Sequence, residues 1–526
     1  MILNMLAVVA VVFATTTSVS AMTTMNVGST ASTANSYVAA IVEYSPIAYA
    51  FPNNVTQDIA VQYMLQNVMQ YKQFITQAVE QKAQIIVFPE YGITGNNFAN
   101  SRDRAFSFME TVPYPDPFNP IIPCDNTDTP ILNALSCMAL ANKIVVVVNM
   151  ADVQYCNTTN DVNCPSDGRY QFNTQVAFGS NGAIIGRYHK SHLYRGEAPV
   201  MDQPIVPDIE MFTTDFNVTF GMMICFDILF EEPQSTLVAA GVNNFVYSTE
   251  WVNGNYAYAR QIQQAMSYNS RSNVLASNIG SINMMSGSGI FSNGQPMATF
   301  FNPTFSPQSH LVVATVPSDP SSVQAQQLST FYSEPLCSDD QPPKVNMRPN
   351  YSGVPPNTFN SSFTIFKPSS HQSNIALQSE NNGFVCNLKY STKEVPGDQH
   401  FAVVSFNGFF NGHWNAQICM VAICLDDTEA GCSQLVFKSK TVFTDFEMSA
   451  AISEGYNVNA MIYSENVMSN YYQSYDPNTY TFAITGMNDP MISASMFAQQ
   501  WTNVTMTTIS ASTFSAKPFT STFLVR

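Results

Sequence analysis

The sequence predicts an α/β domain that is followed by a smaller, mainly β domain. Three observations support this prediction: the length of the chain, a first part in which helical and strand-like apolar patterns alternate, and a second part with strand-like patterns only. At 526 residues the chain exceeds the size of about 250 to 300 residues at which single cores stop growing. Because 45% of the residues are hydrophobic and 12% are aromatic, there is enough apolar material for globular cores.

The first part, residues 35–317, carries the α/β pattern. Apolar residues recur at helical spacing over 57–83, and the continuous apolar run at 85–88 is typical of a buried strand. Segment 258–273 also has helical character. A hairpin is expected around the turn signal Asn181-Gly182, between strands at 175–178 and 183–188. Further interior strands are expected at 143–149, 220–224, 244–247 and 274–276. These elements predict a mixed sheet covered by helices.

The composition changes after residue 317. Residues 318–359 are polar and rich in proline and asparagine, which is typical of a linker or a long surface loop. Beyond them, alternating apolar patterns predict strands at 400–406, 417–424, 461–463 and 479–484. Residues 360–526 are therefore expected to form a β-rich C-terminal domain.

The charge of the chain excludes some partners. Lysine and arginine total 20 against 37 aspartates and glutamates, which gives a net charge of −17. Such a chain repels nucleic acid and anionic membrane surfaces. Charged residues make up only 11% of the chain, so its solubility must depend on neutral polar groups and on attached sugar.

Residues 1–21 have the pattern of a secretory signal peptide, because a short apolar run at 6–13 is followed by small residues up to Ala21. A buried N-terminal segment of the mature fold is the alternative. No later stretch is long and apolar enough for a transmembrane helix. Six glycosylation sequons point to secretion into the extracellular space, and they lie at Asn54, Asn157, Asn217, Asn350, Asn360 and Asn503.

The chain has ten cysteines, and in an oxidising compartment most of them should pair. Short spacings suggest the local bridges Cys124 to Cys137 and Cys156 to Cys164. If Cys225 stays reduced, nine cysteines remain, so at least one more must be free or bonded to another chain.

Three predicted strands end in residues that can carry chemistry. Glu90 follows the strand at 85–88, Lys190 follows the strand at 183–188, and Cys225 follows the strand at 220–224. Active sites of α/β sheets usually form at such strand ends. Taken singly, these residues could also be a loop glutamate, an ordinary surface lysine and half of a disulfide. A helix beginning near Pro233 would lower the pKa of the Cys225 thiol.

Together the three motifs resemble the nitrilase, or carbon-nitrogen hydrolase, superfamily, and most of all its biotinidase and vanin branch. The resemblance rests on Phe88-Pro89-Glu90, Tyr188-His189-Lys190 and Cys225-Phe226-Asp227, and it extends over roughly residues 35–520. In the second domain it continues through 382–386 and 418–424. It implies an αββα sandwich followed by a β-rich domain.

The resemblance also implies roles for the site residues. Glu90 would be the catalytic base, Cys225 the nucleophile, and Lys190 with the backbone N–H of Phe226 would hold the oxyanion. Glu197 matches a second acidic position and would orient Lys190 or a water molecule, unless it is a solvated surface glutamate. This chemistry requires no metal or organic cofactor. His189 and His192 are expected to be hydrogen-bonding or surface histidines, because no further ligand cluster completes a metal site.

The branch implies a small linear amide as substrate: the vanin resemblance implies a pantetheine-like amide, hydrolysed to pantothenate and cysteamine, and a biotinyl amide is the alternative. The stretch 260–267 departs from the vertebrate pattern of the branch, so the substrate preference stays open. Two other classes are alternatives: a secreted binding protein that has lost turnover, and a disulfide-linked structural glycoprotein in which Cys225 would be oxidised. The sequence leaves the oligomeric state open.

Overall fold

The computed structural model describes residues 35–47, 55–95, 98, 101–194, 196–254, 256–280, 284–304, 306–323, 361–393, 395, 397–410, 414–464, 472–476 and 479–500. All of them belong to one compact unit, Ala34–Arg526. Within these ranges, no helix has the length and apolar character that crossing a bilayer would need. The expected signal peptide and most of the expected linker lie outside the described residues.

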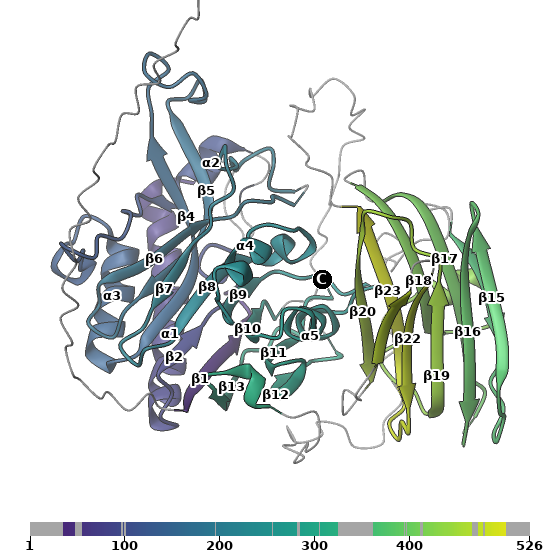
Figure 1. Ribbon diagram of the computed structural model, residues 1–526. Coiled ribbons are helices and arrows are strands. Elements are labelled where there is room, and N and C mark those ends of the chain that lie inside the picture. The colour runs from purple at the N-terminus through teal and green to yellow at the C-terminus, as the bar shows by residue number, and fades with distance from the viewer. Residues whose placement is uncertain are drawn as a thin grey trace, which may run out of the picture. The chain divides into compact units, whose positions relative to one another are not determined.

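The first part of the chain forms two mixed sheets rather than the single sheet that the apolar runs predicted (Figure 1). The first sheet has the strand order β13 (His310–Pro317), β1 (Ser36–Glu43), β2 (Ile85–Val87), β4 (Val145–Tyr155), β5 (Arg169–Phe178) and β6 (Ile184–His189), with β3 (Met109–Glu110) beside β4. The second has the order β12 (Gln295–Phe300), β11 (Ser288–Ser292), β10 (Asn273–Asn278), β9 (Asn244–Thr249), β8 (Thr219–Ile224) and β7 (Met211–Thr213). The central strands of both sheets are parallel.

Alternate side chains of the first sheet enter two different cores. Ile85 and Val87 pack with residues of the second sheet, whereas Ile86 between them packs with the helices α1 (Gln57–Glu80) and α3 (Pro130–Asn142). Strands buried on both faces have no polar face, and for this reason their sequences are continuously apolar. Since α5 (Ala259–Asn269) packs on the outer strands of the second sheet, the layers form the αββα sandwich that the resemblance implied.

The predicted helices are present with shifted ends. Helix α1 stops at Glu80 instead of residue 83, and α5 stops at Asn269. The helix expected near Pro233 is α4 (Gln234–Ala239), and the remaining helices are the short α2 (Arg102–Phe106) and α6 (Glu429–Cys432). Three 3-10 turns are also described: η1 (Pro123–Asp125), η2 (Cys225–Leu229) and η3 (Pro320–Ser322).

The second part of the chain is mainly β, as predicted, and consists of two antiparallel sheets (Figure 1). One has the order β14 (Ser362–Phe366), β17 (His400–Phe410), β18 (Trp414–Cys424), β23 (Met491–Gln500) and β20 (Tyr456–Ser464). The other has the order β15 (Ile375–Asn381), β16 (Phe384–Thr392), β19 (Phe443–Ala450), β22 (Thr479–Thr485) and β21 (Tyr472–Asp476). Phe401 and Val403 enter the core of this part, whereas Ala402 and Val404 join the core cluster of the αββα sandwich.

Four disulfides are described. The predicted bridges Cys124–Cys137 and Cys156–Cys164 are confirmed. Two further bridges, Cys386–Cys419 and Cys424–Cys432, cross-link the second part. Cys225 is free and buried, which contradicts the oxidised Cys225 that a disulfide-linked structural glycoprotein would require. Cys337, the remaining cysteine, lies outside the described residues.

Candidate active site

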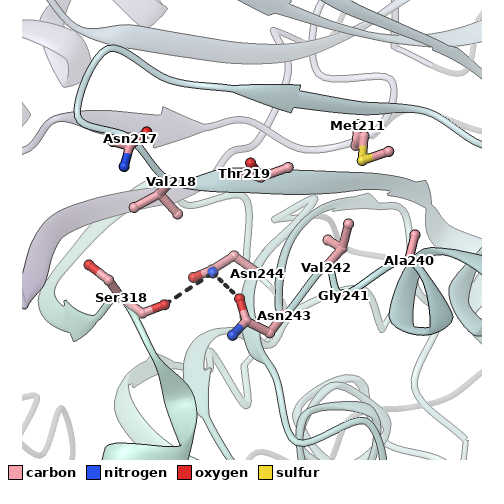
Figure 2. Close-up of a pocket in the computed structure, with 10 residues that line it drawn as sticks. All are labelled: Met211, Asn217, Val218, Thr219, Ala240, Gly241, Val242, Asn243, Asn244 and Ser318. Atoms are coloured by element: carbon pink, nitrogen blue, oxygen red, sulfur yellow. Dashed lines mark hydrogen bonds between the residues drawn. The ribbon is translucent and has the colours of Figure 1, made fainter. Parts of the chain in front are cut away.

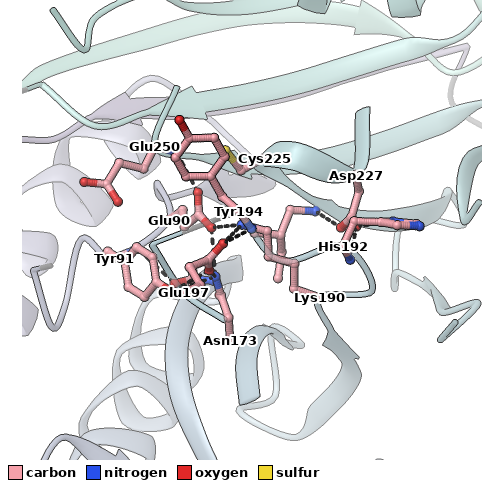
Figure 3. Close-up of polar contacts among 12 residues, drawn as sticks. Glu90, Tyr91, Asn173, Lys190, His192, Tyr194, Glu197, Cys225, Asp227 and Glu250 are labelled. Carbon is pink, nitrogen blue, oxygen red and sulfur yellow. Dashed lines mark hydrogen bonds and ion pairs between the residues drawn. The ribbon is translucent and has the colours of Figure 1, made fainter. Parts of the chain in front are cut away.

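Three strand ends, two from the first sheet and one from the second, bring the predicted site residues together (Figure 3). Glu90 comes shortly after β2, Lys190 directly after β6 and Cys225 directly after β8. Although 100 residues separate Glu90 from Lys190, the Lys190 Nζ donates to Glu90 Oε1 at 2.7 Å. Cys225 lies beside Glu90 (Figure 3), and the two groups interact electrostatically. The sandwich thus assembles a thiol, a carboxylate and an ammonium from distant parts of the sequence.

A buried ion-pair network surrounds Lys190. Its Nζ also donates to Glu197 Oε2 at 2.6 Å, and Lys190 and Glu90 are each only 1% exposed. Burial acts to lower the pKa of Lys190, but the carboxylates of Glu197 and Glu90 outweigh it and hold that pKa well above its usual value. Burial raises the pKa of Glu90 above its usual 4.5, whereas the charge of Lys190 lowers it and Glu197 raises it again. Glu197 is therefore a buried partner of Lys190 rather than a solvated surface glutamate.

Two residues that the sequence did not single out, Asn173 and Tyr91, complete this network. Asn173 on β5 directs its Nδ2 at Glu90 Oε1, 2.8 Å away, and at Glu197 Oε1, 2.6 Å away. The hydroxyl of Tyr91 donates to Glu197 Oε1 at 2.6 Å. Asn173 itself is fixed by Asn149, whose Nδ2 donates to Asn173 Oδ1 at 2.5 Å. Asn149, which directly follows the apolar run 145–148 in β4, was the available signal, because a buried amide needs partners.

Cys225 occupies a sharp turn with a left-handed backbone. Its φ is +43°, a conformation that non-glycine residues seldom adopt and that is common at functional sites. The turn η2 begins at Cys225, and the carbonyl of Cys225 accepts a 2.7 Å bond from the Tyr247 hydroxyl. The predicted lowering of the thiol pKa is wrong. Helix α4 begins nine residues later, and burial together with the charge of Glu90 raises the pKa of Cys225 well above its usual value.

Asp227 holds this turn in place. Its Oδ2 accepts bonds from the Tyr188 hydroxyl at 2.8 Å and from the Ile224 backbone N–H at 3.0 Å. Its Oδ1 accepts the backbone N–H of His192 at 2.9 Å and lies 2.9 Å from Nδ1 of the same residue. The fully buried Asp227 therefore connects the turn that carries Cys225 to the segment that carries Lys190.

A third carboxyl group, Glu250, lies at the end of β9 beside the site (Figure 3). Its backbone N–H donates to Glu90 Oε2 at 2.8 Å. Burial, followed by the charges of Glu90 and Glu197, raises the pKa of Glu250 well above its usual value. Sequence reasoning missed this residue because it belongs to none of the three motifs.

The remaining predicted site residues are Phe226 and the six glycosylation sequons. Phe226 follows Cys225 on the 3-10 turn and packs edge-to-face against Tyr194, with ring centroids 5.4 Å apart. Asn157 and Asn217 are exposed, as glycan acceptors must be. The other four sequons, at Asn54, Asn350, Asn360 and Asn503, lie outside the described residues.

The two predicted hydrogen-bonding histidines each contact a buried aspartate. His189 Nε2 lies 2.9 Å from Asp152, and His192 contacts Asp227. In the described ranges, no group of three or more His, Cys, Asp or Glu side chains could hold a metal ion.

A separate pocket of about 360 Å³ lies around the start of β8 and of β9, away from these residues (Figure 2). Its lining contains no charged side chain and includes the sequon residue Asn217. Without an acid, a base or a nucleophile, this pocket offers no catalytic chemistry.

Comparison with known proteins agrees with this site. A carbon-nitrogen hydrolase family model matches residues 55–278, and a vanin C-terminal domain model matches residues 352–504. Human pantetheinase is 30% identical over 486 residues, which are 90% of each chain. Biotinidase of Takifugu rubripes is 32% identical over 436 residues, 77% of this chain and 82% of that protein. The chain therefore belongs to the carbon-nitrogen hydrolase family, as a hydrolase of carbon-nitrogen bonds other than peptide bonds, in the branch that carries a vanin C-terminal domain.

Proposed function

We propose that this protein cleaves a small linear amide through a thioester on Cys225. The observation that carries the proposal is the convergence of Cys225, Glu90 and Lys190 at three strand ends, where Glu90 accepts a hydrogen bond from Lys190 and interacts electrostatically with Cys225. A nucleophile, a base within hydrogen-bond reach and a fixed cation are the parts that amide hydrolysis needs.

In the first half-reaction Glu90 takes the thiol proton while Cys225 attacks the amide carbonyl. The thiol is neutral at rest, because burial raises its pKa, so proton transfer has to accompany attack. Lys190 and the backbone N–H of Phe226 stabilise the oxyanion of the tetrahedral intermediate. Glu90 then gives its proton to the departing amine, and the acyl group remains on Cys225 as a thioester.

In the second half-reaction Glu90 activates a water molecule that hydrolyses the thioester. The acid leaves, and the proton returns to the thiol. Glu197 and Asn173 hold Lys190 and Glu90 in position throughout, since both contact the pair directly. No step requires a metal or an organic cofactor.

The proposed substrate is a pantetheine-like amide, which would give pantothenate and cysteamine. Relatives named pantetheinase support this choice, and relatives named biotinidase, at a similar identity, support biotinyl amides as the second candidate. We further propose that the protein is secreted and glycosylated, which four disulfides and the exposed sequons at Asn157 and Asn217 support.

Parallel turnover of a pantetheine amide and a biotinyl amide by the purified secreted protein tests the proposal. The Cys225→Ala variant serves as the control, and circular dichroism checks that it folds. We expect hydrolysis of the pantetheine amide, and none in the variant, because the thioester cannot form. Turnover by folded Cys225→Ala would disprove that Cys225 is the nucleophile. If the wild type hydrolyses neither amide, a binding role is favoured.

A further inference from the structure

Glu250 is a carboxyl group at the candidate site that the proposed mechanism does not use. It touches the catalytic machinery through its backbone, whose N–H donates to Glu90 Oε2 at 2.8 Å. Its side chain extends on the other side of Glu90 from Lys190 and Asn173 (Figure 3). It is partly buried, and no described residue forms a hydrogen bond with its carboxyl oxygens.

The charges around Glu250 are unbalanced. Glu90 and Glu197 both act electrostatically on Glu250, and among the described residues Lys190 is the cation that acts on it. Lys190 is already hydrogen-bonded to Glu90 and Glu197. Among the described residues, the Glu250 carboxyl group therefore has no ionic partner of its own, and a carboxyl group in such a low-dielectric site favours a ligand that brings a positive charge.

We propose that Glu250 is a specificity-determining residue that selects amides whose departing amine carries an ammonium group. This inference rests on the proposed amide hydrolysis. It favours departing amines with an ammonium group over the uncharged thiol of cysteamine, so it ranks aminoalkyl amides above pantetheine itself. When such a substrate binds, the Glu250 carboxylate pairs with the substrate ammonium, and any proton on the carboxyl group passes to solvent. A carboxylate on the departing amine is disfavoured at the same place, because it faces like charges.

The departing amine, rather than the acyl group, is expected to meet Glu250. Glu90 must reach the departing nitrogen to protonate it, and one oxygen of Glu90 is bonded by Lys190 while the other is bonded by the backbone of Glu250. Groups attached to that nitrogen therefore pass close to the Glu250 side chain. The bond to Glu90 comes from the main chain, so a side-chain substitution leaves it intact.

The experiment compares kcat/KM for three pantothenoyl amides that differ only in the amine: aminoethyl, hydroxyethyl and carboxymethyl. A matched biotinyl series is run alongside. We expect wild type to prefer the cationic amide over the anionic one, and Glu250→Gln to reduce that ratio on the order of tenfold, the effect of one partly buried ion pair. The neutral amide should change less than about threefold, and Glu250→Asp should keep most of the preference.

Glu80→Gln is the matched control, because it removes an exposed glutamate at the end of α1, which precedes β2, whereas Glu90 follows β2. If the ratio of kcat/KM for the cationic amide to that for the anionic amide is the same in Glu250→Gln as in wild type, the specificity role is overturned. Hydrolysis of the amides would still support the proposed function. If no amide in either series is hydrolysed, the proposed function fails and Glu250 is tested by thiol labelling. Aminoethyl methanethiosulfonate should then modify Cys225 faster than its sulfonatoethyl analogue, and Glu250→Gln should remove that difference; equal rates in wild type would reject the proposal.

Discussion

The two parts of the chain differ in what they bury. In the described residues of the αββα sandwich, acidic and basic side chains lie in the interior, and the buried ones are Glu43, Glu90, Glu110, Asp152, His189, Lys190, Glu197 and Asp227. In the described residues of the C-terminal β part, the buried polar side chains are those of Ser, Thr, Asn and Gln, without one Asp, Glu, Lys or His.

The difference indicates that the groups needed for catalysis lie in the sandwich, whereas the interior of the β part serves stability. A buried charge costs several kcal/mol unless partners compensate it, so a fold keeps such groups where they are paired. Lys190 and Asp227 have their partners within 3 Å. The β part buries its apolar faces and secures them with disulfides, which stabilises a fold but provides no acid or base. We therefore expect substitutions in the sandwich to affect catalysis, and substitutions in the β part to affect stability.

Replacing a buried lysine of the sandwich and an exposed lysine of the β part gives the strongest test of the difference between the two parts. Lys190→Ala should lower kcat by about a hundredfold or more, the usual loss when an oxyanion donor is removed. It should also cost about 3 to 5 kcal/mol in the free energy of unfolding, because Glu90 and Glu197 lose their buried partner. Single-turnover kinetics and urea unfolding measure the two effects.

Lys389→Ala is the control for that experiment. Lys389 pairs with Glu447 at 3.0 Å on the surface of the β part, where Lys389 is exposed and Glu447 is half-buried. The loss should stay below about 1 kcal/mol, with unchanged activity. If Lys190→Ala and Lys389→Ala change kcat and the free energy of unfolding equally, the catalytic role of the sandwich is contradicted.

Asp227→Ala should give the next largest effect. It leaves the Tyr188 hydroxyl and the Ile224 N–H without their buried acceptor, at about 1 to 3 kcal/mol for each group. Because the turn that carries Cys225 is then less fixed, kcat should fall by roughly ten- to a hundredfold. Asp445→Asn, an exposed position on β19, is the control. Normal kcat in folded Asp227→Ala would show that the turn holds the thiol without this residue.

The pH profile of kcat/KM gives a graded test of the buried network. Glu90 has to be ionised to accept the thiol proton, and its pKa is raised by burial, so activity should fall as pH drops through a value above 4.5. On the alkaline side the pKa of Lys190 is well above its usual value, so activity should persist past about pH 9. Glu197→Gln should move the acid limb to lower pH, because Glu197 raises the pKa of Glu90. If the acid limb stays at the same pH in Glu197→Gln, the fall in activity is caused by the titration of a group other than Glu90.

Removing the Cys386–Cys419 bridge by a double alanine substitution should have the smallest effect on catalysis. Both sulfurs are fully buried in the β part, and the bridge closes a loop with a sequence separation of 33. We expect about 2 to 5 kcal/mol less stability and a kcat within about twofold of wild type for the folded fraction. A large loss of kcat in folded protein would show that the β part shapes the site.

Much of the site could be predicted from short segments of the sequence. The apolar runs before Glu90 and Cys225 predicted strands that end at these residues, and the Asn181-Gly182 hairpin led to Lys190. Such signals are local, since strand burial and turn chemistry are readable within a few residues. Asn173 and Glu250 carried no comparable signal, because their roles depend on strands that only the fold makes neighbours.

The sequence by itself determined the main helices and strands of the first part, the mainly β second part and two disulfides, because periodicity, turn residues and short cysteine spacings act over short distances. The tertiary structure decided the separation into two sheets, the pairing of Lys190 with Glu197 and the pKa of the Cys225 thiol. A pKa depends on burial and on charges from distant segments, which exist only once the layers have packed.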